Sequence, residues 1–130
     1  MVTDPISDML VQLKNAAMVG KPSVIVPLSN VKMEIAKVLL ENGYLSDVSK
    51  RGKKNRKFLQ CDLAYVGGKS RLTEVKRMSK PSRRIYQGVA DIRSVRQGMG
   101  LAVLSTPKGI LADKQAKEQN VGGELLFMIW

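Results

Sequence analysis

The residues best suited to chemistry in this sequence lie close together, directly after an apolar run in the second half of the chain. The run is Leu101–Leu104, and Ser105, Thr106, Lys108 and Gly109 follow it. The two hydroxyl groups can donate and accept hydrogen bonds, the ammonium can pair with an anion, and the glycine lets a partner approach the backbone closely. These groups suit two kinds of chemistry. One is the binding of a polyanion such as nucleic acid, and the other is nucleophilic attack by a serine that a lysine activates.

The nucleophile hypothesis depends on the spacing Ser-x-x-Lys, which Ser105 and Lys108 satisfy. In the penicillin-binding enzymes this pair is accompanied by Ser-Asp-Asn and Lys-Thr-Gly elements. Here a glycine follows the lysine directly, and both companion elements are absent from the sequence. A small Ser–Lys hydrolase is therefore retained only as an alternative function, which covalent labelling of Ser105 by an acylating reagent would reveal.

Other signatures of catalysis or of bound metal fail in this sequence. The segment Gly67–Ser70 resembles the end of a phosphate-binding P-loop, but that motif requires a glycine where Leu63 stands. Histidine, the commonest general base and metal ligand, does not occur. The one cysteine, Cys61, falls on the apolar phase of an expected strand, which indicates a core residue. We therefore expect no enzyme activity, no metal and no cofactor.

Charge is the abnormal quantity in this composition. The 130 residues include 22 Lys and Arg against 11 Asp and Glu, a formal net charge of +11. Such an imbalance costs stability through self-repulsion unless a polyanion lies against the protein. Nucleic acid and an anionic membrane surface are the two candidates. The membrane alternative lacks a long basic amphipathic helix, because both helices expected near the start mix acidic and basic residues.

The sequence shows no recognisable targeting or membrane-spanning segment. Its first residues, Met1–Pro5, lack the basic and then apolar pattern of a signal peptide, and no apolar run approaches the roughly 20 residues needed to cross a bilayer. We expect a soluble, cytoplasmic protein.

Hydrophobic periodicity predicts the elements that position these groups in the first half of the chain. A helix is expected to begin at Thr3-Asp4-Pro5 and to end before Gly20, and a second is expected from Ser29 or Asn30 to Gly43. Strands are expected at residues 24–26, 44–48 and 59–65. A pair of helices that covers a small sheet follows from this order.

The second half is predicted to be rich in strands. They are expected at residues 72–75, 85–86, 101–104 and 124–130, with short helices that begin at Asp91 and Asp113. We predict an α+β fold in two small lobes, residues 1–66 and 67–130, that divide at the glycines of Gly67–Ser70.

Two basic clusters have more than one interpretation. Residues 50–57 contain six Lys and Arg around turn-forming residues, so they predict a hairpin tip that is either a solvated loop or a source of non-specific phosphate contacts. In the second cluster, Lys80, Arg83 and Arg84 could contact phosphates while Tyr86 stacks on a base or ribose. The alternative is that Tyr86 is a core ring beside a basic edge strand.

Several motifs occur in an order that is specific in combination. They are Asp4–Leu10, Ser79–Pro81 with Arg84–Tyr86, Leu104–Gly109 with Asp113, and Gly122–Glu124. Together they closely resemble the family of bacterial small ribosomal subunit protein eight, and the resemblance covers essentially the whole chain. It implies the same two-lobed α+β architecture and a non-enzymatic component of the small ribosomal subunit, in contact with neighbouring ribosomal proteins.

The resemblance also implies a partner and a binding mode. Members of the family bind a hairpin in the central domain of small-subunit ribosomal RNA, read its irregular core mainly through the C-terminal domain, and help the region assemble. Some members bind a similar hairpin in the messenger RNA of their own operon and repress its translation, a role that this sequence does not separate from the first.

The residues expected to contact RNA follow from the resemblance position by position. Those of the loop are Ser105, Thr106, Pro107, Lys108 and Gly109. Glu124 would position the loop and accept hydrogen bonds from RNA, and Tyr86 would lie alongside. Thr3, Asp4 and Lys32 would form a smaller N-terminal contact.

Two residues depart from the family's pattern. Pro107 stands where many members have a second serine, so its hydrogen bonds must be lost or moved to Ser105 and Thr106, although proline can order the loop before binding. Asn30 replaces a common lysine, which leaves Lys32 as the better candidate for the N-terminal contact.

Overall fold

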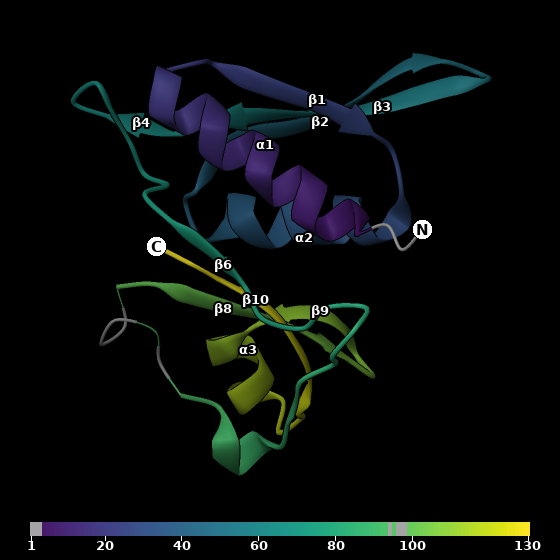
Figure 1. Ribbon diagram of the computed structural model, residues 1–130, viewed down its shortest axis with the longest axis vertical. Coiled ribbons are helices and arrows are strands. Elements are labelled where there is room, and N and C mark those ends of the chain that lie inside the picture. The colour runs from purple at the N-terminus through teal and green to yellow at the C-terminus, as the bar shows by residue number, and fades with distance from the viewer. Residues whose placement is uncertain (1–3, 94, 96–98) are drawn as a thin grey trace. The chain divides into compact units, whose positions relative to one another are not determined.

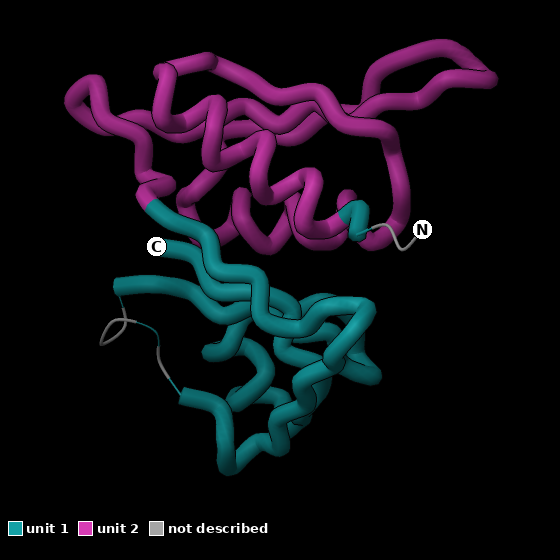
Figure 2. The backbone as a smooth tube through the Cα atoms, viewed as in Figure 1, with its two compact units in different colours: residues 1–5, 74–130 teal, residues 6–73 magenta. Residues whose placement is uncertain are grey.

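The computed structural model describes residues 4–93, 95 and 99–130, and these residues form two compact units (Figures 1 and 2). Unit 2 contains residues 6–73, and unit 1 contains residues 74–130 together with Asp4 and Pro5. The chain passes between the units at Thr73–Glu74, seven residues after the boundary expected from the sequence. A small hairpin of residues 65–70 spans the expected boundary and stays with unit 2, where the Arg71 amide donates to the Ala64 carbonyl (3.0 Å).

Unit 2 is a three-stranded antiparallel sheet with two helices on one face (Figure 1). Its elements are α1 (Pro5–Val19), β1 (Ser23–Pro27), α2 (Asn30–Glu41), β2 (Leu45–Lys53), β3 (Arg56–Leu63) and a small hairpin of β4 (Tyr65–Val66) and β5 (Lys69–Ser70). The sheet order is β1-β3-β2, with every pair antiparallel. The α1 and α2 helices and the alternation of buried residues along β1 and β3 confirm the pattern expected for this half.

Local sequence explains where the helices of unit 2 begin and what they bury. Pro5 occupies the first position of α1, where its missing amide hydrogen costs nothing. Ser29 caps α2, and its hydroxyl accepts from the Lys32 amide (3.2 Å). Apolar residues three and four apart then face the sheet, including Leu13 and Ile35, which are both fully buried.

Unit 1 is built on a second antiparallel sheet of order β6-β10-β8-β9, with β7 also paired to β10. Its elements are β6 (Val75–Arg77), β7 (Tyr86–Gln87), a 3₁₀ turn (Val89–Asp91), β8 (Leu101–Thr106), β9 (Gly109–Ala112), α3 (Asp113–Glu118) and β10 (Gly123–Ile129). One buried cluster combines residues of β8 and β10 with residues from the turn region and α3; its members are Ile92, Val95, Ala102, Leu104, Ala116 and Leu125. The α+β fold class predicted from the sequence is confirmed.

Several predicted elements differ in detail. The strand expected at 72–75 is displaced to β6, because the ladder with β10 begins only at the pair Val75–Ile129. Asp91 ends a 3₁₀ turn instead of beginning a helix, since its amide bonds back to the Gly88 carbonyl (3.0 Å). The helix expected to begin at Asp113 does so, since Asp113 is the first residue of α3 and Ala112 is its N-cap. Residues 94 and 96–98, where the short helix was expected to continue, lie outside the described residues.

Candidate nucleic-acid interface

The five residues from 105 to 109 form the end of a tight β-hairpin, not an open loop. Thr106 pairs with Gly109 across β8 and β9, so only Pro107 and Lys108 connect the two strands. The Thr106 hydroxyl accepts from the Lys108 amide (3.1 Å) and donates to the Gly109 carbonyl (2.8 Å). Gly109 has φ +107°, a conformation that other residues rarely adopt. The expectation that the strand ends at Leu104 and that residues 105–109 form a loop is therefore wrong, and the true turn is shorter and held by its own hydrogen bonds.

Ser105 differs from Thr106 in having a hydroxyl that is not used in building the hairpin. Its backbone lies in the sheet, paired with Ile110 on β9 and Glu124 on β10. Its side chain is partly exposed, and its Oγ makes no hydrogen bond to any other described residue. Ser105 therefore presents a rigidly placed donor and acceptor to a partner.

Three of the predicted contact residues lie side by side across the sheet. Tyr86 pairs with Glu124, and Glu124 pairs with Ser105, so the three share one face at the strand spacing of about 5 Å. The neighbouring pair Leu104–Leu125 points to the opposite face and is buried in the core. We call Tyr86, Glu124 and Ser105 the Ser105 row. Tyr86 is 71% exposed, so the interpretation of this ring as a core residue is wrong.

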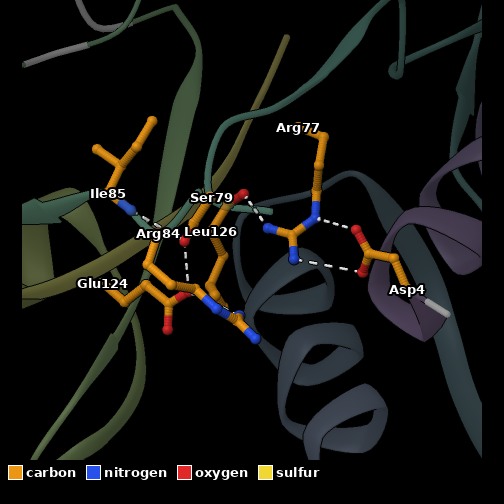
Figure 3. A network of polar contacts seen from close by, with 7 residues as sticks. All are labelled: Asp4, Arg77, Ser79, Arg84, Ile85, Glu124 and Leu126. Atoms are coloured by element: carbon orange, nitrogen blue, oxygen red, sulfur yellow. Dashed lines mark hydrogen bonds and ion pairs between the residues drawn. The ribbon is translucent and has the colours of Figure 1, made fainter. Parts of the chain in front are cut away.

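Glu124 is held in place by two donors (Figure 3). The fully buried Ser79 donates its hydroxyl to Glu124 Oε2 and accepts from the Ile85 amide (3.1 Å). Arg84 Nη1 reaches the same carboxylate oxygen at 3.1 Å. This arrangement fixes the carboxylate and partly offsets its charge, which would otherwise repel a phosphate backbone. Arg84 is thus engaged by Glu124, whereas the sequence assigned it to phosphate.

The other cations of the second basic cluster are free of such partners. Lys80 and Arg83 face each other across a tight turn closed by two backbone hydrogen bonds (2.9 and 3.0 Å). Both side chains are exposed, and neither pairs with an acidic residue within the described part of the chain. Lys108, at the end of the β8–β9 hairpin, is also exposed. These three residues can contact phosphates without breaking an existing ion pair.

The residues of the expected N-terminal contact are arranged differently. Asp4 forms a two-point ion pair with Arg77 (3.0 and 3.3 Å), and Arg77 also donates to the Leu126 carbonyl (Figure 3). Lys32 lies in unit 2 with only 9% of its surface exposed, and its ammonium approaches the Pro27 carbonyl (3.4 Å). Thr3 lies outside the described residues. Neither described residue presents a free polar group comparable to Ser105.

Sequence reasoning overlooked the spatial role of two adjacent glycines. A Cβ built on Gly123 would lie 2.9 Å from the Ser105 carbonyl carbon and 3.1 Å from Thr106 Cα, with the Ser105 oxygen nearer still. A Cβ on Gly122 would meet the backbone of Gly88 at 2.8 and 3.0 Å. The absence of side chains at these positions lets β10 approach both neighbours. The pair Gly122-Gly123 before a strand was the available signal.

The geometry weighs against the catalytic alternatives. Ser105 and Lys108 lie on a β-hairpin, whereas the hydrolase pattern requires the first turn of a helix. Gly67 and Gly68 form the tip of the β4–β5 hairpin, not a strand-to-helix loop. Burial, together with the charge of Asp62, raises the pKa of the Cys61 thiol to about 11, so the thiol is protonated and unreactive near neutral pH.

Within the residues that the structure describes, no group of three or more acidic or Cys side chains could hold a metal ion. Over the same residues, no helix combines the length and the apolar character needed to cross a bilayer.

Comparison of the sequence with known proteins places this chain in a family. The profile of the family described as ribosomal protein S8 matches residues 4–130. The chain belongs to the ribosomal protein S8 family. The small ribosomal subunit protein uS8 of Mycoplasma mobile is 43% identical over 129 residues, which cover 99% of this chain and 97% of the relative. The uS8 protein of Dictyoglomus thermophilum is 46% identical over 129 residues, 99% of this chain and 98% of its own length.

A third relative extends the match across the full length of another member. The uS8 protein of Ruegeria pomeroyi is 42% identical over 130 residues, covering 99% of this chain and all of the relative. The family predicted from the Asp4–Leu10, Leu104–Gly109 and Gly122–Glu124 motifs is therefore confirmed. Family membership does not by itself assign a role to individual residues.

Proposed function

We propose that this member of the ribosomal protein S8 family is a non-enzymatic constituent of the cytoplasmic small ribosomal subunit and binds small-subunit ribosomal RNA through unit 1. Its relatives are small-subunit proteins by name. The net charge of +11 suits a partner with a phosphate backbone. The proposed target is a hairpin in the central domain of that RNA, beside neighbouring ribosomal proteins. Repression of an operon messenger RNA stays a prediction of the resemblance.

The observation that carries this proposal is the free hydroxyl of Ser105 beside the fixed carboxylate of Glu124. Double-helical RNA hides its deep groove, so proteins recognise irregular bases and the sugars of the shallow groove. A short hydroxyl at the end of a strand can approach such a surface closely. The carboxylate can accept a hydrogen bond from a base amino or imino group, and the exposed Tyr86 ring offers a stacking surface in the same row.

The cations around the row supply affinity that does not depend on sequence. Lys80, Arg83 and Lys108 are exposed, and we assign them to phosphate contacts. Arg84 acts instead by holding Glu124. Pro107 is exposed between the two strands and contributes a pre-ordered turn, while the backbone beside Gly109 stays open to close approach.

The N-terminal contact is the part of the expectation that receives the least support. The Asp4 carboxylate is already paired with Arg77, and the Lys32 ammonium is largely buried. Direct RNA contact by either side chain would require an existing interaction to be broken. We therefore base the proposed site on unit 1, with the Ser105 row at its centre.

A binding titration tests the proposal. The full chain is titrated against the central-domain hairpin and against a hairpin of equal length with a scrambled core, at low and at physiological salt. We expect the cognate hairpin to bind at least about 100-fold more tightly, which corresponds to about 2.7 kcal/mol, and to stay bound at physiological salt. Equal affinities that fall together as salt rises would show that only charge acts, and would refute specific recognition.

A further inference from the structure

The hairpin of β2 and β3 ends in an arm whose charge the proposed site does not use. We define the basic arm as residues 50–57, which contain six Lys and Arg in eight positions. Unit 2 as a whole has twelve basic and five acidic residues, so outside the arm its charges nearly balance. The arm therefore carries almost all of the net positive charge of this unit.

The arm extends beyond the rest of its sheet (Figure 1). Strand β1 ends at Pro27, opposite Phe58, so the tip beyond Lys57 consists of β2 and β3 alone. Every residue from 50 to 58 is exposed. Gly52, with φ +106°, lets the two strands stay close at the tip, because a Cβ there would lie 3.2 Å from the Arg56 carbonyl carbon.

The charges of the arm are uncompensated within the chain. No acidic residue occurs between Asp47 and Asp62, and none of the six cations forms an ion pair or side-chain hydrogen bond with another described residue. Lys53 and Arg56 are directly opposite each other across the strands, an arrangement of like charges that destabilises a two-stranded ribbon. A polyanion bound at the tip would reverse this repulsion.

The side chains beside the cations indicate which polyanion the arm fits. Phe58 is 37% exposed and pairs with Arg51 on one face of the hairpin, so a ring and a guanidinium lie together there. That combination suits a base together with a phosphate. Insertion into a membrane surface or docking on an acidic protein would call for apolar residues at the tip, and positions 50–57 contain none.

We propose that the basic arm is a second RNA-binding element, separate from the Ser105 row, in which the six cations contact phosphates and Phe58 stacks on an exposed base. The choice of RNA as the partner rests on the proposed function. The arm itself is argued from its charge, exposure and lack of internal partners. It binds without sequence preference, because the phosphate backbone is the same in every RNA.

The test compares two sets of three substitutions that remove equal charge from unit 2. The arm variant is K53Q/K54Q/R56Q, and the control variant is K21Q/K37Q/K69Q, which changes three exposed lysines outside the arm. The probe is a labelled single-stranded uridine oligomer of about 12 nucleotides, a length typical of such sites. Circular dichroism of both full-length variants verifies that each is folded.

The arm variant is expected to bind the oligomer at least about tenfold more weakly than the wild type, with the slope of log affinity against log salt reduced by about 2. The control variant should lose less than about threefold. F58L should weaken binding by about fivefold or more without changing the slope, because it removes a stacking ring and no charge. Equal losses in the two triple variants, or unchanged binding by F58L, would overturn the proposal.

Two further measurements separate this proposal from its alternatives. The proposed function is judged only on discrimination between the cognate and scrambled hairpins, whereas the arm is judged only on binding of the uridine oligomer. Failure of that discrimination and failure of the arm are thus distinguishable. Binding of the wild type to phosphatidylserine vesicles as tight as its binding to the oligomer would overturn the assignment to RNA in favour of an anionic surface.

Discussion

A methyl group added at Gly123 should disturb RNA recognition without changing any side chain that contacts the RNA. Gly123 begins β10 and lies against the backbone of β8, one residue before Glu124. The substitution Gly123→Ala places a Cβ 2.9 Å from the Ser105 carbonyl carbon, where an ordinary contact begins at 3.4 Å. The neighbouring atoms belong to backbone, which cannot rotate away as a side chain can.

The geometry sets the size of the effect. The strands must separate by at least about 0.5 Å at Ser105, and overpacking of this kind costs about 1–3 kcal/mol of stability. This separation changes the spacing between the Glu124 carboxylate and the Ser105 hydroxyl, which are the two polar groups of the Ser105 row besides Tyr86. A binding site tolerates only about 0.5 Å of error in the placement of its groups, so we expect discrimination between the cognate and scrambled hairpins to fall by about tenfold.

The assay pairs urea unfolding with titrations of both hairpins, and Gly100→Ala is the control. Gly100 lies before the other end of β8, where a Cβ would meet Val95 Cγ1 at 2.6 Å and the Ile129 carbonyl oxygen at 3.0 Å. This variant should also lose stability, yet discriminate within about twofold of the wild type. A Gly123→Ala protein that is destabilised but discriminates as well as the wild type would refute the reasoning.

Three further predictions concern single side chains. Ser79→Ala should lower the free energy of unfolding by about 1–3 kcal/mol in urea titrations, because the Ile85 amide and Glu124 lose a buried partner; unchanged stability would contradict this. Lys80→Ala should weaken the cognate and scrambled hairpins equally and reduce the salt slope by about 1, whereas a loss confined to the cognate hairpin would assign the residue to base recognition. For Cys61, folding raises the thiol pKa from 9.0 to about 11, so its contribution to stability is present below pH 9 and is lost as the pH rises towards 11. Wild-type stability should therefore fall by up to about 3 kcal/mol more than that of Cys61→Ala over this pH range, and parallel curves would contradict the raised pKa.

Local signals in the sequence were sufficient for most of unit 2. Pro5 and Ser29 mark helix starts by chemistry that acts within one turn, and the alternation through Leu59 and Cys61 identifies the central strand. The elements that the sequence predicted at the wrong positions are those whose extent depends on pairing between strands. Ser105 and Thr106 are residues typical of turns, but ladders with β9 and β10 keep them extended.

In the candidate site, too, the sequence identifies single residues, but their arrangement depends on contacts between distant parts of the chain. The sequence identified Ser105, Glu124 and Tyr86 as candidates, yet their alignment in one row depends on the register of three strands. The ion pairs of Arg84 with Glu124 and of Arg77 with Asp4 join residues 40 and 73 positions apart, which no spacing rule predicts. Side chains that appear free in the sequence are therefore not all available to a partner.

The most direct test of the central claim measures discrimination by Ser105→Ala. Affinities of the wild type and the variant for the cognate and scrambled hairpins are determined side by side at physiological salt. Loss of one hydrogen bond in a desolvated interface should cost about 1–3 kcal/mol, so the ratio of the two affinities should fall by at least about fivefold, with binding of the scrambled hairpin unchanged. An unchanged ratio would show that the free hydroxyl of Ser105 does not read the RNA and would contradict the account.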